Sequence, residues 1–179
     1  MNDLSTQKQR PHLLRGVIAG AAGGLVASWV MNVFLAGSSK AQEALKDPVE
    51  REQDEAQQAS AGDDSTQKVA DAVTHAVMGK HLSKEEKKTG GPLVHYLFGS
   101  ITGGIYGGVA EYSRSSRIGA GTVFGSALFL AADELMVPAL GLSKPPTQQP
   151  ASSQVNHWAG HLVYGATVEL VRRGLRRIL

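Results

Sequence analysis

The chain has 179 residues, enough for one domain, and a formal net charge of +2. It contains no cysteine, which excludes disulfides, thiolate metal sites and cysteine nucleophiles. Its basic residues flank apolar segments and are not interleaved with aromatic residues, so we expect no binding to nucleic acid. Charge is concentrated in residues 40–88 and at the ends, between four apolar stretches rich in glycine and alanine. This pattern predicts an all-α fold: a four-helix transmembrane bundle forming a single membrane domain, residues 1–179.

The first predicted span covers residues 13–37 and carries Arg15 as its one charge. It is long enough to cross about 30 Å of hydrocarbon. Small residues recur at every fourth position, which places Gly16, Gly20 and Gly24 on one helix face that continues to Ser28 and Asn32. Small-residue faces let membrane helices approach closely. A cleaved signal peptide is the alternative, but the apolar run is long for one.

A long polar loop, residues 38–91, follows. Its acidic part, residues 40–64, has no sustained apolar periodicity and is interpreted as a solvated helix or a flexible segment. Asp64 or Ser65 can cap the next helix. That helix is too short to span, so we expect it to lie on the membrane surface or against the bundle. The segment LSKEEKKTGGP is predicted to be a polar turn.

The second span, residues 92–112, repeats the spacing of four. One face would carry a histidine, three glycines and a glutamate: His95, Gly99, Gly103, Gly107 and Glu111. Three glycines would be costly in the interior of a soluble helix, each by about 1 kcal/mol against alanine. In a bilayer such a face is a common surface for helix contact.

The third span covers residues 118–142, and a short basic link joins it to the second as a hairpin. Its GAGTVFG segment is similar to a phosphate-binding glycine fingerprint, but no strand precedes it, so packing glycines are the favoured interpretation. Asp133 and Glu134 lie within this span, and Pro138 is expected to kink or end it.

The fourth span covers residues 155–172. Every fourth residue again falls on one face, and this face would carry His157, His161, Gly165, Glu169 and Arg173. Four spans place both termini on one side. The basic residues of the short loops and of the C-terminal tail favour the cytoplasm for that side.

Counting 1.5 Å per residue places the histidines and acids of the spans at a common depth near the outer surface. This predicts an intramembrane polar cluster of His95, Tyr96, Asp133, Glu134, His157, His161 and Tyr164. Three interpretations stay open: a structural hydrogen-bond network, a metal or haem site, and a proton or ion relay. The Glu-x-x-His pairs of di-iron bundles are missing, as is a metalloprotease glutamate between His157 and His161.

The inner side is predicted to hold charge pairs formed by Glu111, Glu169, Arg172 and Arg173. Glu169 lies three and four residues before the two arginines, a spacing at which side chains on one helix meet. The favoured interpretation is structural, with carboxylates near the membrane surface neutralised by arginines.

The segments GGPLVHYLFGSITGGIYGGVAEY, ADELMVPALGLSKPP and GHLVYGATVELVRRGLRR resemble the YagU-type bacterial inner-membrane proteins, over residues 65–179. The residues that match the family pattern are His95, Tyr96, Gly99, Glu111, Asp133, Glu134, Pro138, Pro145, His161, Tyr164, Glu169 and Arg172. The resemblance implies an integral protein of the bacterial inner membrane with a domain of unknown function. It implies no established reaction.

Three function classes remain. The first is an accessory subunit or scaffold, a homo-oligomer or part of a membrane complex, packed through glycine faces that exceed what one hairpin needs. The second is a channel or carrier that uses the polar cluster, and the third is a metal- or haem-binding redox component. No nucleophile–base pair and no cofactor fingerprint is found, so we expect neither an enzyme nor a resident cofactor. The lipid bilayer is the expected surrounding.

Overall fold

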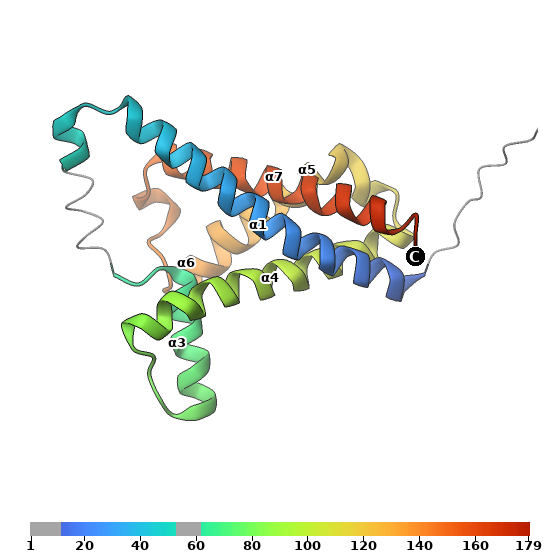
Figure 1. Ribbon diagram of the computed structural model, residues 1–179, viewed down its shortest axis with the longest axis horizontal. Coiled ribbons are helices and arrows are strands. Elements are labelled where there is room, and N and C mark those ends of the chain that lie inside the picture. The colour runs from blue at the N-terminus through green and yellow to red at the C-terminus, as the bar shows by residue number, and fades with distance from the viewer. Residues whose placement is uncertain (1–11, 53–61) are drawn as a thin grey trace, which may run out of the picture.

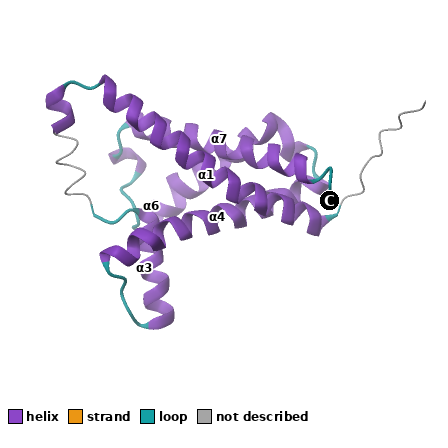
Figure 2. Cartoon of the chain, viewed as in Figure 1, coloured by secondary structure: helices purple, strands orange, loops and turns teal. Residues whose placement is uncertain are grey.

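The computed structural model describes residues 12–52 and 62–179, and these are almost entirely helical (Figures 1 and 2). No strand occurs in either range, so the all-α prediction is confirmed for the described residues. Part of the acidic stretch 40–64 lies outside them. The long helices are α1 (Leu13–Leu45), α4 (Lys84–Tyr112) and α7 (Ala151–Leu175). A fourth leg, the α5–α6 leg, is assembled from α5 (Thr122–Leu128), the π-helix η2 (Phe129–Met136) and α6 (Val137–Ala139).

Consecutive legs of the bundle run antiparallel (Figure 1). Gly16 of α1 lies against Gly107 of α4, whereas Gly24 lies against Gly99. The first residues of α1 therefore lie beside the last residues of α4 and α7, at what we call the basic end. The last residues of α1 lie at the opposite end, with the first residues of α7. We call this the histidine end.

Helices α1 and α4 touch through a glycine seam, which consists of Gly16, Gly20 and Gly24 of α1 and Gly99, Gly103 and Gly107 of α4. A Cβ atom at Gly20 would overlap the Gly103 carbonyl oxygen and lie 2.8 Å from Gly107 Cα. A Cβ atom at Gly103 would lie 2.5 Å from the Gly20 carbonyl oxygen. The two backbones are therefore in direct contact, and any side chain in the seam would force them apart.

Large apolar side chains lie on the outside of the bundle. The outer face of α4 carries residues that are between 49% and 63% exposed: Leu93, Leu97, Ile101, Ile105 and Val109. The interior holds glycines, alanines and several charged groups, including Glu169 and Arg172. A protein folded in water shows the opposite distribution. Two helical segments, Leu13–Leu45 and Ser115–Ala139, are long and apolar enough to cross a membrane.

Helix α4 begins eight residues before the predicted second span. The LSKEEKKTGGP segment is not the predicted turn, because Ser83 caps a helix that continues through Pro92. The Ser83 hydroxyl accepts from the Glu86 N–H at 3.3 Å, and the Glu86 carboxylate accepts from the Ser83 N–H at 2.8 Å. This reciprocal capping satisfies two backbone donors and fixes the helix start. Helix α1 likewise continues to Leu45, past residue 37.

The α5–α6 leg begins at Thr122 instead of residue 118. Residues 119–121 have positive φ, including Ala120 at 51° and Gly121 at 92°. At Gly121 a Cβ atom would also overlap the Gly165 carbonyl oxygen, so this turn seats the leg directly on α7. Pro138 lies one residue before the last residue of α6, in agreement with its predicted role in ending the helix.

Helix α3 (Ser65–Met78) is the amphipathic helix expected in the polar loop. Asp64 caps it, and its first turns pack on the start of α4, where a Cβ atom at Gly90 would lie 3.0 Å from Ala70 Cβ. Of the two predicted locations, the structure shows the contact with the bundle. Helix α3 also projects away from the four legs at the histidine end (Figure 1).

Candidate functional site

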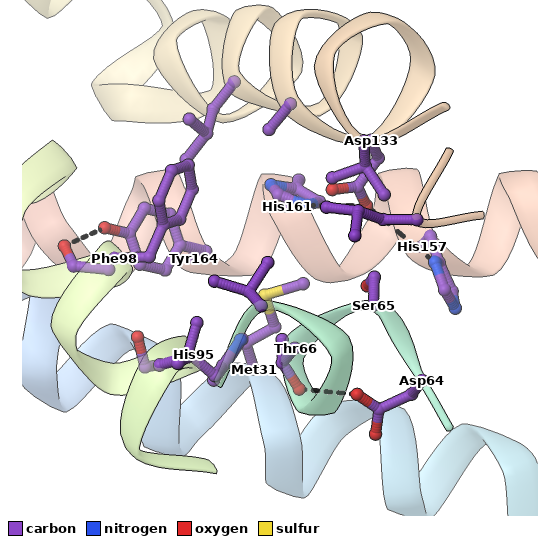
Figure 3. A pocket seen from close by; sticks show the side chains of 18 of the residues that line it. Met31, Asp64, Ser65, Thr66, His95, Phe98, Asp133, His157, His161 and Tyr164 are labelled. Carbon is purple, nitrogen blue, oxygen red and sulfur yellow. Dashed lines mark hydrogen bonds and ion pairs between the residues drawn. The ribbon is translucent and has the colours of Figure 1, made fainter. Parts of the chain in front are cut away.

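A cavity of about 590 Å³ lies at the histidine end, between α1, α4, α7 and the α5–α6 leg (Figure 3). The cap and first turn of α3, residues 64–66, complete its wall. Most of the lining is apolar and includes Met31, Leu35, Phe98 and Leu128. A few polar side chains converge on it. A largely apolar pocket with few polar groups is the usual form of a small-molecule site.

Asp133 contacts both histidines of α7 that line the cavity. Its Oδ2 atom lies 3.1 Å from His161 Nε2 and 3.8 Å from His157 Nδ1 (Figure 3). The two histidines are one helical turn apart on α7, which brings both rings to the same carboxylate. The His161 side chain is only 8% exposed, whereas that of His157 is 52% exposed. His161 is therefore the buried partner of Asp133 at the cavity wall, and Asp133 itself is 32% exposed.

Three buried polar atoms have no hydrogen-bond partner in the described part of the chain. They are His95 Nε2, His161 Nδ1 and Ser28 Oγ. All three residues line the cavity. A buried polar atom without a partner costs about 1–3 kcal/mol, so such atoms mark places where a bound molecule or water completes the structure.

Five of the seven residues predicted for the polar cluster line this cavity: His95, Asp133, His157, His161 and Tyr164. Tyr96 does not line it and instead makes an edge contact with His95, with ring centroids 5.9 Å apart. Glu134 does not line it either, because adjacent helical positions point in different directions.

Sequence reasoning did not assign Ser28 and Asn32 to the cluster, although both line the cavity. The signal was present, since both continue the spacing of four that begins at Gly16. Asp64 was recognised only as a helix cap, which it is, with its carboxylate accepting from the Gln67 N–H at 2.8 Å. Its second position, at the cavity wall, depends on how α3 folds back on the bundle.

Aromatic residues close the cavity toward the basic end. The Tyr164 hydroxyl donates to the Gly99 carbonyl oxygen at 2.5 Å and lies 3.0 Å from Thr102 Oγ1. Beyond it Phe124 stacks on Tyr106, with ring centroids 4.4 Å apart. The cavity therefore ends at Tyr164, and an aromatic stack separates it from the opposite end of the molecule.

The basic end holds the predicted charge pairs. Glu169, 1% exposed, accepts from Arg172 Nε at 2.7 Å, from Arg173 Nε at 2.6 Å and from the Tyr106 hydroxyl at 3.0 Å. Glu111 accepts from Arg176 Nε at 2.7 Å and from Arg172 Nη1 at 3.4 Å. We call these residues the charge latch. Sequence reasoning did not include Arg176, one turn after Arg172.

The described residues contain no group of three histidine, cysteine, aspartate or glutamate side chains placed to hold a metal ion. Asp133 and its two histidines come closest to such an arrangement, but the His157 contact is long at 3.8 Å.

Residues 63–170 match the family model described as "Protein of unknown function (DUF1440)". This confirms the prediction of a domain of unknown function, which the resemblance placed over residues 65–179. Neither the curated proteins nor the solved structures contain a match.

Proposed function

Since the chain belongs to the DUF1440 family of proteins of unknown function, we propose a role for it from the cavity at the histidine end. The protein is a multi-pass membrane protein that binds a small solute between its four legs, as a carrier or channel does. The observation that carries this proposal is the pair of His161, which is buried, and Asp133, which is partly exposed, at the wall of a cavity of about 590 Å³. Ionisable groups inside a membrane bundle are costly and are typical of solute or ion paths.

The distribution of side chains supports the membrane location. Leucine, isoleucine and valine are exposed along the outer face of α4, while its glycines are buried. Lipid solvates such a surface, and water does not. The exposed arginines Arg15, Arg114 and Arg177 lie close to the ends of the legs at the basic end. We therefore propose the bacterial inner membrane, with the basic end in the cytoplasm, as for the YagU-type proteins that the sequence resembles.

The shape of the interior supports a solute path with one end closed. The cavity reaches from the first turn of α3 down to Tyr164, and the stack of Phe124 on Tyr106 lies beyond it. A carrier or closed channel has this form, with a binding site accessible from one side and a barrier toward the other.

Proteoliposome flux tests the proposal. Wild-type protein is expected to take up at least one of radiolabelled tetramethylammonium, arabinose or gluconate faster than empty liposomes. The His161→Ala variant is expected to remove this difference, because it dismantles the cavity wall. The matched control is His75→Ala on α3, outside the cavity, which should retain uptake. No uptake of any of the three solutes, or equal uptake by the His161 variant, would refute the solute path.

Cysteine labelling tests the same cavity without a solute, because the chain has no cysteine of its own. A thiol introduced by Ala132→Cys lines the cavity, and a membrane-impermeant maleimide should label it from the outer side. The control is Ala110→Cys, which is equally buried at the basic end and should stay unlabelled. Labelling of both positions, or of neither, would contradict an open cavity at one end.

The oligomeric scaffold predicted first from the sequence is a separate proposal. It relied on glycine faces in excess of what one hairpin needs, and the faces of α1 and α4 contact each other in the seam. Light scattering in mild detergent tests it by the mass of the particle. The redox alternative is tested by an absorbance spectrum and elemental analysis of the purified protein.

A further inference from the structure

We propose that the cavity selects a small organic cation, such as a protonated amine on an apolar body. This inference rests on the proposed function, because it names the solute class that the cavity takes. It is argued from the charges at the wall, from the unpaired polar atoms and from the apolar surface beside them.

The charged groups at the wall are of one sign. Asp133 and Asp64 line the cavity, and no lysine or arginine does so in the described part of the chain. His157 and His161 both contact the Oδ2 atom of Asp133, so the Oδ1 atom is left as an acceptor beside the cavity. With low-dielectric walls around it, this carboxylate attracts a cation and repels an anion.

The polar atoms without a partner at this wall would accept hydrogen bonds from a ligand that carries donors. In the neutral ring of His161, a proton on Nε2 is shared with Asp133, and Nδ1 then carries a lone pair. Asp133 Oδ1 and His161 Nδ1 therefore both accept hydrogen bonds. An ammonium group has only donors, so its chemistry complements this side of the cavity.

The other side of the cavity fits an apolar body. Met31, Leu35 and Leu128 supply aliphatic surface, and Phe98 and Tyr164 supply aromatic faces. Aromatic faces attract organic cations through their quadrupoles. A bare metal ion gains nothing from such a wall, and the described residues offer no group of three ligands for it.

An anion is excluded by the arrangement of the arginines. The buried arginines of the charge latch, Arg172 and Arg176, are bound to Glu169 and Glu111. The aromatic stack of Phe124 and Tyr106 lies between this latch and the cavity. These arginines therefore add no unpaired positive charge to the cavity, and the Lys68 ammonium donates to the carbonyl oxygen of Leu142, a lining residue, at 2.8 Å.

A shape-matched series of three probes tests the inference. Phenethylamine is a cation at pH 7.5, 2-phenylethanol is neutral and 3-phenylpropanoate is an anion. Calorimetry on the purified full chain in a non-ionic detergent should show the amine binding at least tenfold tighter than the alcohol. In Asp133→Asn the affinity for the amine should fall at least tenfold, while that for the alcohol stays the same. The matched control is Glu134→Gln, a neighbouring carboxylate that does not line the cavity and should leave all three affinities unchanged.

The outcomes separate the inference from the function on which it rests. Equal affinity of wild type for the amine and the alcohol would overturn cation selection but leave a solute cavity. Tightest binding of the anion would also overturn it. Binding of none of the probes would count against both proposals. If Asp133→Asn does not fold, the wild-type series decides charge selection. Asp133→Glu, which keeps the charge, should then retain tighter binding of the amine.

Discussion

The two ends of the bundle use similar residue types in opposite ways. At the basic end, Glu169 and Glu111 each form a close ion pair with a buried arginine. At the histidine end, Asp133 contacts two histidines at the cavity wall, and His161 retains an unpaired nitrogen. A charge inside a helical bundle therefore has a structural role when its partners saturate it. It is available for binding when they do not.

The largest expected effect is at the charge latch. Glu169→Gln should lower the free energy of unfolding by about 3–5 kcal/mol, because it removes the nearer of the two carboxylates that pair with the buried Arg172 and leaves only Glu111 at 3.4 Å. Asp133→Asn at the histidine end should cost much less, because Asp133 is partly exposed. Chemical unfolding in detergent measures both variants. Equal losses would remove the distinction between a saturated and an unsaturated end.

The glycine seam joins the two ends, so a change in it should weaken the whole bundle. Gly20→Ala should destabilise the protein by about 1–3 kcal/mol, since the new Cβ overlaps the α4 backbone. The control is Gly37→Ala on the same helix, where no atom lies within 4 Å of the new Cβ. The control should be neutral or slightly stabilising, because alanine is the better helix former. A loss in both variants would point to helix propensity instead of contact.

Two tyrosines offer a finer comparison of the ends. Tyr106 donates to the charged Glu169, whereas Tyr164 donates to the neutral Gly99 carbonyl. Hydrogen bonds to charged groups contribute more, so Tyr106→Phe should cost about 2 kcal/mol and Tyr164→Phe about 1 kcal/mol. Thermal unfolding of the two variants in one detergent gives the ranking. The reverse ranking would contradict a saturated latch.

The smallest effect concerns pH and the junction of α3 and α4, outside the proposed spans. Hydrogen bonds from the Ser83 N–H and from Lys80 lower the pKa of Glu86 to about 2. The Leu82 N–H and His81 lower the pKa of Asp71 in the same way. Because the folded-state pKa of each group lies below its unfolded value, the stabilisation is present above the unfolded value and is lost as pH falls through the folded value.

Hydrogen exchange tests this at single amides. Between about pH 4.5 and pH 2, the protection factor of the Ser83 amide should fall, while that of the Gly103 amide in the glycine seam stays constant. The variant Glu86→Gln keeps a side-chain oxygen that accepts from the Ser83 N–H but has no proton to gain, so protection at Ser83 should not change over this range. A uniform fall along α4 would instead indicate opening of the bundle.

Periodicity predicted more of this structure than local signals did. The spacing of four identified the glycine seam and the turn-to-turn alignment of His157 with His161, because helical geometry converts sequence spacing directly into a face. The same spacing placed Glu169 next to Arg173, and a spacing of three placed it next to Arg172. What it could not supply was the partner helix, and so Arg176 was missed as the closest arginine to Glu111.

Local signals were weaker where two of them competed. The GGP segment suggested a turn, but the capping box of Ser83 and Glu86 starts α4 before it, and Pro92 is accommodated within the helix. The position of Asp64 at the cavity depends on the packing of Ala70 against Gly90, a contact between residues far apart on the chain. Such long-range contacts depend on the tertiary fold and cannot be predicted from a short segment of the sequence.

The length of α1 has a mechanical consequence. Its 33 residues extend about 50 Å, whereas the hydrocarbon layer of a bilayer is about 30 Å thick. In a bilayer the last turns of α1 would therefore extend beyond the hydrocarbon into water. Helix α1 contacts α4 through the glycine seam and α7 at Gly23. A tilt of α1 would therefore move these three helices together. A partner bound to the last turns of α1 would therefore change the width of the cavity.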